Sequence, residues 1–238
     1  MRSSICRRKH ARRKRRGVGT NNTGVTGANH GVAWAQMVND VALWVSDQPC
    51  AVNSAPPFPC SYSSKITVAG AIDIEDFNGA GVPANTEQWA EAYAATIRLF
   101  YYNYGACEVC SSGQPSSFFS EGHDYIWYVS WGIPNALVIP EIYNVNGVNA
   151  DQWRNVSYYA ASCSLPCRPA QLGLSSRIYF SGTFTQWQRC QSSPRSPSCN
   201  GADNSPEVGW QQLFDALYAE PITRQNVLPW STDITWTN

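Results

Sequence analysis

The sequence predicts an α/β fold, specifically a TIM-like (β/α) barrel that is incomplete at its N-terminus and carries local disulfides. Apolar runs of strand length alternate with amphipathic helical segments, which is typical of a parallel sheet covered by helices. No glycine-rich phosphate loop is present, which disfavours a nucleotide-binding doubly wound sheet. The length of 238 residues is close to the ~250 residues of a complete barrel. Eight of the nine cysteines fall into close pairs.

Helices are expected at about residues 31–45 and after three helix-start signals further along the chain. Thr86 and Ser205 are favourable N-cap residues, and Ser205 is followed by proline and an acidic residue. Asn149 is expected to begin a helix that has Gln152 at the capping-box position. Each of these segments repeats apolar residues at helical spacing, so one face of each helix should be buried.

Strands are expected where apolar or aromatic residues run without helical spacing. The expected strands cover residues 66–75, 98–104, 125–131, 136–143 and 177–182, with a short one at 233–236. No strand is expected before the opening helix. We therefore predict that at least one N-terminal β/α unit is missing from the barrel.

The first sixteen residues differ in charge from the rest of the chain. Nine of the 17 Lys and Arg lie between Arg2 and Arg16, so residues 17–238 carry 8 basic against 17 acidic residues, or 8 − 17 = −9. We predict a disordered basic tail over residues 1–16 that contributes no strand, followed by one partial-barrel domain over 17–238. A misassigned start or shifted reading frame would explain the tail. A genuine polybasic arm would bind nucleic acid or acidic lipid headgroups.

The acidic body argues against nucleic acid as a partner except through this tail. No stretch approaches the ~20 apolar residues that cross a bilayer, so no membrane span is expected. The tail lacks the apolar region of a standard secretory signal. Nothing in the sequence indicates an oligomeric state.

The cysteine spacing predicts disulfides between sequence neighbours and an extracellular protein. The expected pairs are 50–60, 107–110, 163–167 and 190–199, and Cys6 stands alone in the tail. Two alternatives stay open. Cys107 and Cys110 have the spacing of a redox pair, and the two central pairs together offer four zinc ligands.

Functional groups of a parallel barrel lie where its strands end. Asp73 and Glu75 are two residues apart and therefore share one face of their strand. Glu141 follows a proline within another apolar run. Carboxylates interleaved with aromatic rings suit a sugar substrate. The strand ends offer Asp73, Glu75, Asp76, Asn103, Tyr104, Ser130, Trp131, Glu141, Tyr143, Thr183 and Thr185.

No cofactor is expected, because no nucleotide-binding motif is present. No two-histidine metal motif is present either, so no metal is expected. His123 stands beside Asp124, but no Gly-x-Ser-x-Gly nucleophile elbow accompanies them, and His123 is expected at the surface.

Several short motifs resemble a family. They are Ala71-Ile-Asp-Ile-Glu75, Trp131-Gly132, Pro140-Glu-Ile-Tyr143 with Gln152-Trp153, and Trp230-Ser-Thr-Asp-Ile-Thr-Trp236. Together they are similar to a group of uncharacterised secreted bacterial proteins with glycoside-hydrolase-like barrels, found especially in actinobacteria and their relatives. The likeness spans roughly residues 20–238.

The Asp-x-Glu strand end also resembles the lysozyme-like muramidase barrels. That resemblance implies Glu75 as proton donor and Asp73 as its partner. The muramidase family also uses an aspartate on its first strand, for which the sequence shows no counterpart.

We therefore expect a secreted glycoside-hydrolase-like barrel that acts on a polysaccharide or cell-wall glycan. Glu75 would be the general acid, and Asp73 or Glu141 would stabilise the developing cation. Trp131, Tyr143 and Asp76 would line the substrate cleft. The carboxyl groups should lie about 5–10 Å apart, with Glu75 in the less polar surroundings. The alternative is a non-catalytic carbohydrate-binding or surface protein, with Asp73 merely satisfying backbone groups or an arginine.

Overall fold

The computed structural model describes residues 14–48, 66–75, 82–110 and 121–234. Its strands are all parallel and follow one another in chain order. β1 (Lys14–Asn21), β2 (Ile66–Asp73), β3 (Tyr101–Asn103) and β4 (Ala136–Val138) form one sheet, and β5 (Thr183–Thr185) pairs with β6 (Ser231–Asp233). A parallel bridge between Glu141 and Phe184 connects the two sheets.

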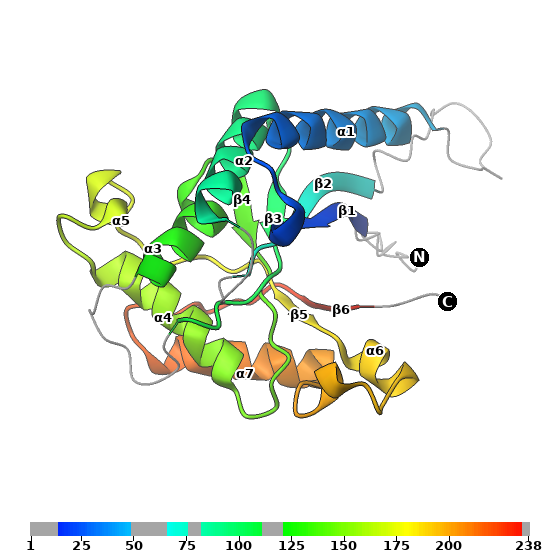
Figure 1. The fold of residues 1–238 in the computed structure, drawn as a ribbon. Coiled ribbons are helices and arrows are strands. Elements are labelled where there is room, and N and C mark those ends of the chain that lie inside the picture. The colour runs from blue at the N-terminus through cyan, green and yellow to red at the C-terminus, as the bar shows by residue number, and fades with distance from the viewer. Residues whose placement is uncertain (1–13, 49–65, 76–81, 111–120, 235–238) are drawn as a thin grey trace, which may run out of the picture.

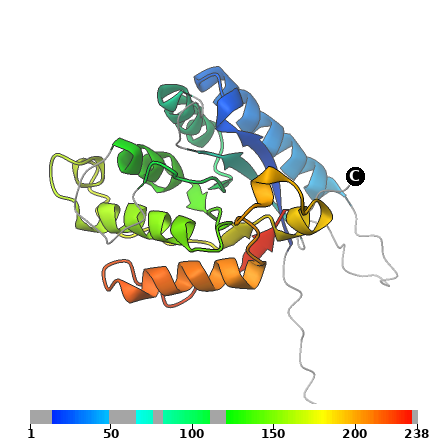
Figure 2. The same ribbon diagram turned by 60° about the horizontal axis from the view of Figure 1, so that its bottom comes forward.

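Helices separate the strands along the chain and lie on the outer side of the sheet, in an arc from α1 past α4 to α7 (Figures 1 and 2). No helix in the described ranges is both long and apolar enough to cross a membrane. The helices are α1 (Ala28–Asp47), α2 (Pro83–Thr96), α3 (Glu121–Trp127), α4 (Val148–Ser162), α5 (Arg168–Gln171), α6 (Trp187–Ser192) and α7 (Pro206–Ala219), with short turns η1 (Asn22–Gly24), η3 (Tyr128–Gly132, a π-helix) and η4 (Pro197–Cys199).

The two faces of the sheet bury different sets of side chains. Alternate residues such as Ile72, Ile74 and Val138 belong to a large apolar core that also contains the buried helix residues. The residues between them point to the inner face, where Ala69, Tyr102 and Ile139 form a second, smaller cluster with Tyr104, Leu137 and Trp230 packed against it. The two-residue period of the strands produces this separation.

The predicted mixed α/β class with a parallel sheet and local disulfides is confirmed. The closed barrel is not shown, because β6 pairs with β5 and no pairing of β6 with β1 occurs among the described residues. The sequence order of the strands is nevertheless that of a singly wound arrangement.

The expectation that no strand precedes the opening helix is wrong. β1 precedes α1, and its residues Lys14–Asn21 pair in register with Ile66–Asp73 of β2. The predicted boundary between tail and domain at residues 16 and 17 therefore falls inside a strand. The run of positive charges obscured this strand, because like charges are typical of solvated tails. Residues 1–13 lie outside the described part of the chain.

The strand expected at residues 125–131 is also absent. This segment forms the end of α3 and the π-helical turn η3, in which Tyr125, Ile126, Trp127 and Val129 are all buried. Six of its seven residues are apolar or aromatic. In such a continuous run a buried helix and a buried strand look alike. The strand expected at 177–182 appears instead as β5, at Thr183–Thr185.

Helix starts were predicted with mixed success. The side chain of Ser205 caps α7 by accepting a hydrogen bond from the backbone of Val208, as expected. α2 begins at Pro83, three residues before the predicted cap at Thr86. α4 follows Gly147 without a side-chain cap, and Gln152 instead donates to the carbonyl of Glu108.

Three of the four predicted disulfides are confirmed: Cys107–Cys110, Cys163–Cys167 and Cys190–Cys199. The pair 50–60 lies outside the described residues. The two central pairs are each closed within themselves, so neither the zinc site nor a reduced redox pair is what the structure shows.

Asn103 links the ends of β2 and β3. Its side-chain oxygen accepts hydrogen bonds from the backbone N–H groups of Ile74 and Gly105, and its nitrogen donates to the Ser130 hydroxyl at 2.7 Å. Asn103 is fully buried. The side chain thus satisfies two backbone donors at the end of β2, beside the residues Asp73 and Glu75.

We expect Asn103→Ala to lower the free energy of unfolding by about 2–4 kcal/mol, because it leaves two buried N–H groups without an acceptor. Chemical denaturation measures this change. Asn39→Ala, on the exposed side of α1, is the matched control and should change stability by less than about 1 kcal/mol. Equal effects of the two substitutions would contradict the bridging role of Asn103.

Candidate active site

The structure brings together the three acids that the sequence singled out. One carboxylate oxygen from each of Asp73, Glu75 and Glu141 lies within 4.8 Å of the others. Asp73 ends β2, Glu75 follows on the same face, and Glu141 stands two residues beyond Ile139 in the continuation of β4. Parallel strands end at one edge of a sheet, and the two-residue period turns all three side chains to its inner face.

An apolar floor and three aromatic rings surround this carboxylate cluster. Ala69 and Ile139 of the inner core precede the acids on the same strands. The ring of Phe184 lies 5.2 Å from that of Tyr104 and 6.5 Å from that of Tyr143, measured between ring centroids. The Tyr143 hydroxyl donates to Glu141 Oε1 at 2.8 Å. Tyr143 therefore contacts an acid directly, at the place where a substrate-lining residue was predicted.

Asn21, at the end of β1, holds Asp73. Its Nδ2 donates to Asp73 Oδ2 at 2.9 Å. Its Oδ1 accepts from both the backbone N–H and the hydroxyl of Thr23, at 2.8 and 2.7 Å. Because Thr23 supplies only donors here, the amide nitrogen must face the carboxylate. The neighbouring Asn22 donates to the backbone carbonyl of Glu75 at 2.9 Å, which anchors the chain two residues beyond the end of β2.

Burial raises the pKa of all three acids. It raises the pKa of Asp73 to about 6, with the Asn21 hydrogen bond acting in the opposite direction. Burial and then the neighbouring charge of Asp73 raise the pKa of Glu75 to about 7. Glu141 is only 9% exposed, and burial followed by repulsion from Asp73 raises its pKa well above the ordinary value. The site therefore holds protons near neutral pH.

Glu75 is the least buried of the three acids, so the prediction that it occupies the less polar surroundings is not borne out. Asp73 receives the Asn21 amide, whereas Glu141 lies deeper than either of the other two acids. Among the described residues, no Lys or Arg forms an ion pair with any of the three. The alternative in which Asp73 merely satisfies an arginine is thus not what the structure shows.

The cluster offers two kinds of chemistry. A set of desolvated carboxyl groups with different pKa values can donate and accept protons. Three carboxylate oxygens at this spacing are also ligands of the type that Mg²⁺ and Ca²⁺ prefer. Protons and a cation would compete for the same oxygens, so the two chemistries have opposite pH dependence.

Trp131 was expected at a strand end beside the acids, and this expectation is wrong. It lies in η3, which leads into the beginning of β4, while Glu141 follows the other end of that strand. Its ring contacts Tyr179, with centroids 6.1 Å apart. The wrong strand at 125–131 placed it at the wrong edge of the sheet. Asp76, the remaining predicted substrate contact, lies outside the described residues.

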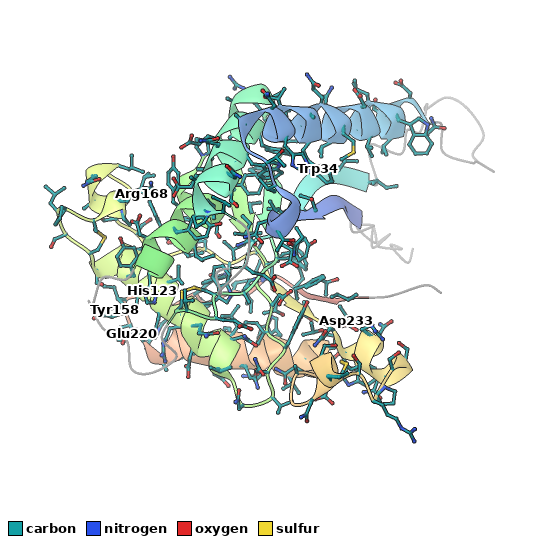
Figure 3. The ribbon with its side chains drawn as sticks, in the orientation of Figure 1. Trp34, His123, Tyr158, Arg168, Glu220 and Asp233 are labelled. Atoms are coloured by element: carbon teal, nitrogen blue, oxygen red, sulfur yellow. A yellow bond between two sulfur atoms is a disulfide. The ribbon has the colours of Figure 1, made fainter. Side chains whose placement is uncertain are left out.

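His123 is buried rather than exposed, at 6% of its surface. It stacks on Tyr159, and burial lowers its pKa. Figure 3 places it with α3 and α4, on the opposite side of the molecule from Asp233 at the end of β6. His123 is therefore a core residue and no part of the carboxylate cluster.

Three residues of the site were not selected from the sequence. Asn21 was hidden by the unrecognised strand β1. Phe184 was skipped because β5 was placed too early. The charge of Glu108 raises the pKa of Glu75 and Glu141, and Glu108 stands in the turn closed by Cys107–Cys110. Its position inside a disulfide loop near a strand end was the signal that could have identified it.

Comparison with protein-family models, with curated proteins and with solved structures yields no match to this chain. Its function must therefore be argued from the geometry of the carboxylate cluster.

The raised pKa values make stability depend on pH. Below the ordinary values of 3.8 and 4.5, Asp73 and Glu75 are protonated in both states. Between pH 3.8 and about 6 for Asp73, and between pH 4.5 and about 7 for Glu75, the folded protein binds more protons than the unfolded chain. The free energy of unfolding therefore falls as pH rises through these ranges. We expect this loss in thermal melts between about pH 4 and about pH 7.

The variant Asp73→Asn with Glu75→Gln carries no charge at these positions and should flatten that part of the pH profile. At pH 8 it should melt at a higher temperature than the parent protein, because two desolvated charges are removed. The raised pKa values would be contradicted if the stability of the parent protein rose from pH 4 to pH 7 and the double variant showed the same slope.

Proposed function

We propose that this chain is a secreted glycoside-hydrolase-like protein that acts on a polysaccharide or cell-wall glycan. The observation that carries the proposal is the carboxylate cluster, in which Asp73, Glu75 and Glu141 lie within 4.8 Å and carry raised pKa values. Glycoside cleavage needs one protonated and one ionised carboxyl group side by side. Aromatic rings at the same strand ends supply surfaces on which sugar rings pack.

The roles follow from the surroundings of each acid. Glu75, half-buried and with a pKa of about 7, is the general acid that gives its proton to the glycosidic oxygen as the bond to the anomeric carbon breaks. Asp73 has the lowest raised pKa, about 6, and as an anion it faces the positive charge that develops on the sugar. Tyr143 and Glu141 fix the deep side of the site.

The spacing favours retention of the anomeric configuration. Inverting enzymes separate their carboxyl groups by about 6.5–9.5 Å, and retaining enzymes by about 5–5.5 Å. Oxygens within 4.8 Å are near the retaining value. In this scheme Asp73 bonds to the anomeric carbon as the leaving group departs with the proton of Glu75. Water then displaces Asp73 and gives its proton to the Glu75 carboxylate, which restores both groups.

The wider setting is part of the same proposal. We propose that the parallel, sequentially ordered strands form part of a (β/α) barrel, which would explain why the acids converge on an inner face. The three disulfides are consistent with an extracellular protein.

A non-catalytic carbohydrate-binding protein is the second candidate, and Asn21 favours it. The muramidase barrels that the Asp-x-Glu motif resembles have an aspartate on the first strand. Here β1 ends in Asn21, whose amide is hydrogen-bonded to Asp73. An amide in place of a carboxylate keeps the hydrogen bond and removes a charge, which binding tolerates better than catalysis.

Hydrolysis of purified peptidoglycan and of soluble chitin and cellulose oligosaccharides tests the proposal. Glu75→Gln should lower kcat by about 10²-fold or more, because general acid catalysis contributes about 10²–10⁴-fold. Glu91→Gln, on the exposed face of α2, is the matched control and should leave the rate unchanged. Release of new reducing ends, resolved by anomer, measures both the rate and the stereochemical outcome.

Equal rates in the parent protein and Glu75→Gln would overturn the assignment of Glu75. A chelator that abolishes hydrolysis, with recovery on adding Mg²⁺ or Ca²⁺, would favour the cation site at the same oxygens. Glycan binding without any release of reducing ends, in both the parent and the Asn21→Asp variant, would favour the binding protein.

The pH profile of kcat/KM gives a separate prediction. Catalysis needs Asp73 ionised and Glu75 protonated, so activity should rise as pH passes about 6 and fall as it passes about 7. The limbs belong to the coupled acids rather than to single residues. A profile that stays flat from pH 5 to pH 9 would contradict this assignment.

A further inference from the structure

A second feature at the carboxyl ends of the strands is a pocket beside Trp187. Trp187 begins α6, directly after β5, and its side chain is 38% exposed. The pocket has a volume of about 320 Å³, within the range of about 300–1,000 Å³ that is typical of small-molecule sites. Its lining residues are Trp187, Gln188, Ser205, Pro206, Glu207 and Asp233.

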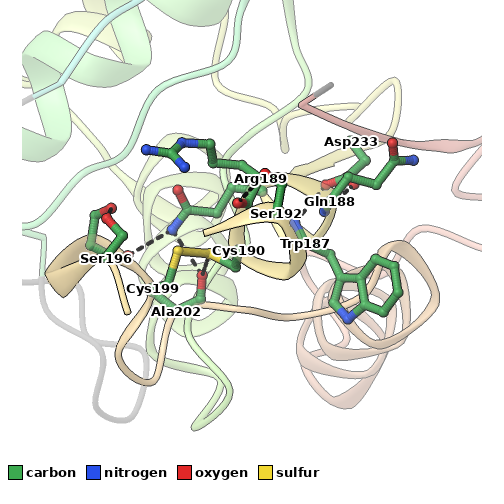
Figure 4. Close-up of a disulfide and its surroundings, with 11 residues drawn as sticks. Trp187, Gln188, Arg189, Cys190, Ser192, Ser196, Cys199, Ala202 and Asp233 are labelled. Carbon is green, nitrogen blue, oxygen red and sulfur yellow. Dashed lines mark hydrogen bonds between the residues drawn. A yellow bond between two sulfur atoms is a disulfide. The ribbon is translucent and has the colours of Figure 1, made fainter. Parts of the chain in front are cut away.

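Hydrogen bonds hold one wall of this pocket in place. Asp233 Oδ1 accepts from the backbone N–H of Trp187 at 2.7 Å, and Oδ2 accepts from the N–H of Gln188 at 2.8 Å (Figure 4). Asp233 Oδ1 also accepts from the hydroxyl of Thr185 at 2.8 Å. Both carboxylate oxygens are thus engaged in fixing the start of α6. The position of the Trp187 backbone is set before any ligand arrives.

The start of α7 forms the opposite wall. Ser205 caps this helix through Val208, and its hydroxyl donates to Glu207 Oε2 at 3.0 Å. Glu207 Oε1 accepts no hydrogen bond from any residue within the described ranges, so it is available to a ligand. Pro206, between these two residues, adds a second rigid apolar surface.

We propose that this pocket is a carbohydrate subsite, with Trp187 as the surface on which a sugar ring packs. The proposal rests on the proposed glycan function and names a further contact for the same substrate. The lining contains no basic residue, which disfavours phosphate and other anions. The carboxylate of Asp233 already accepts three hydrogen bonds from the protein. An indole face, a proline ring, the amide of Gln188 and a free oxygen of Glu207 together match a neutral ligand that has apolar faces and hydroxyl edges.

The pocket and the carboxylate cluster are connected through β5. Phe184 bridges to Glu141, and its ring contacts Tyr104 and Tyr143. Trp187 follows three residues later, so its Cα lies at most about 11 Å from that of Phe184. This separation is short enough for one oligosaccharide to reach both the cluster and Trp187. This residue takes the role that the sequence had suggested for Trp131.

Glycan binding tests the subsite in the Glu75→Gln background, where the proposed cleavage is blocked. The probes are purified peptidoglycan, measured by cosedimentation, and chitohexaose, measured by calorimetry and by the shift of the Trp187 indole N–H signal in NMR. Trp187→Ala should weaken binding by about tenfold or more, and Trp187→Phe should retain most of it. Trp44→Ala removes an indole that is 64% exposed on α1 and should change nothing.

Each result separates the subsite from the proposed reaction. If the Glu75→Gln protein binds glycan equally well with and without the Trp187→Ala substitution, the subsite is overturned, even if the unsubstituted protein hydrolyses glycan. Loss of binding in Trp187→Ala without hydrolysis by the parent protein supports the subsite and contradicts the reaction. Displacement of the glycan by spermine would show that the pocket prefers a cation and would overturn the proposal. Failure to bind both peptidoglycan and chitohexaose also overturns the proposal. If the Trp187→Ala protein does not fold, the Trp187→Phe variant remains informative.

Discussion

The burial of three carboxyl groups above an apolar floor is the constraint on which the other features of this site depend. Asp73, Glu75 and Glu141 would each be ionised in water at neutral pH. Together on the inner face of the sheet they repel one another and lose solvation, so the folded protein favours their protonated forms. Such an arrangement persists only if the surrounding structure fixes it. The contacts around the cluster, from the Asn21 amide to the Tyr143 hydroxyl, are those that fix it.

The backbone at the strand ends is also fixed, by hydrogen bonds and by close packing. Asn103 satisfies the N–H groups of Ile74 and Gly105, and Ile74 stands between Asp73 and Glu75. A Cβ at Gly105 would lie 2.1 Å from the carbonyl oxygen of Ile74. Glycine is therefore required for β3 to approach β2 so closely here. Stability comes mainly from the outer core between sheet and helices, which leaves the inner face free to carry groups that are costly to bury.

Two-residue alternation in the sequence correctly predicted the carboxylate cluster at the centre of the site. Segments without a clear period were assigned the wrong secondary structure. Alternation placed Asp73 and Glu75 on one face, and the expectation that strand ends meet brought Glu141 to them. The run from Tyr125 to Trp131 is apolar or aromatic except at Ser130 and carries no period, so only tertiary packing decides that it is helical. The basic run that begins β1 resembles a tail by charge. Its pairing with β2 is made by the backbone, which the amino-acid composition does not reveal.

Failure to predict β1 from the sequence also affects the assignment of roles to the three acids. Once β1 is recognised, Asn21 becomes a donor that lowers the pKa of Asp73 and of Glu75 but not that of Glu141, and the three acids cease to be equivalent. Asp73 faces an amide whose direction Thr23 fixes, and it is the easiest of the three to ionise. Glu141 is the deepest and receives only the Tyr143 hydroxyl, so it is the hardest to ionise. Glu75 lies between them and is the most open to solvent. A proton that must move to a substrate and return is therefore best carried by Glu75, for reasons of position that its sequence motif alone does not supply.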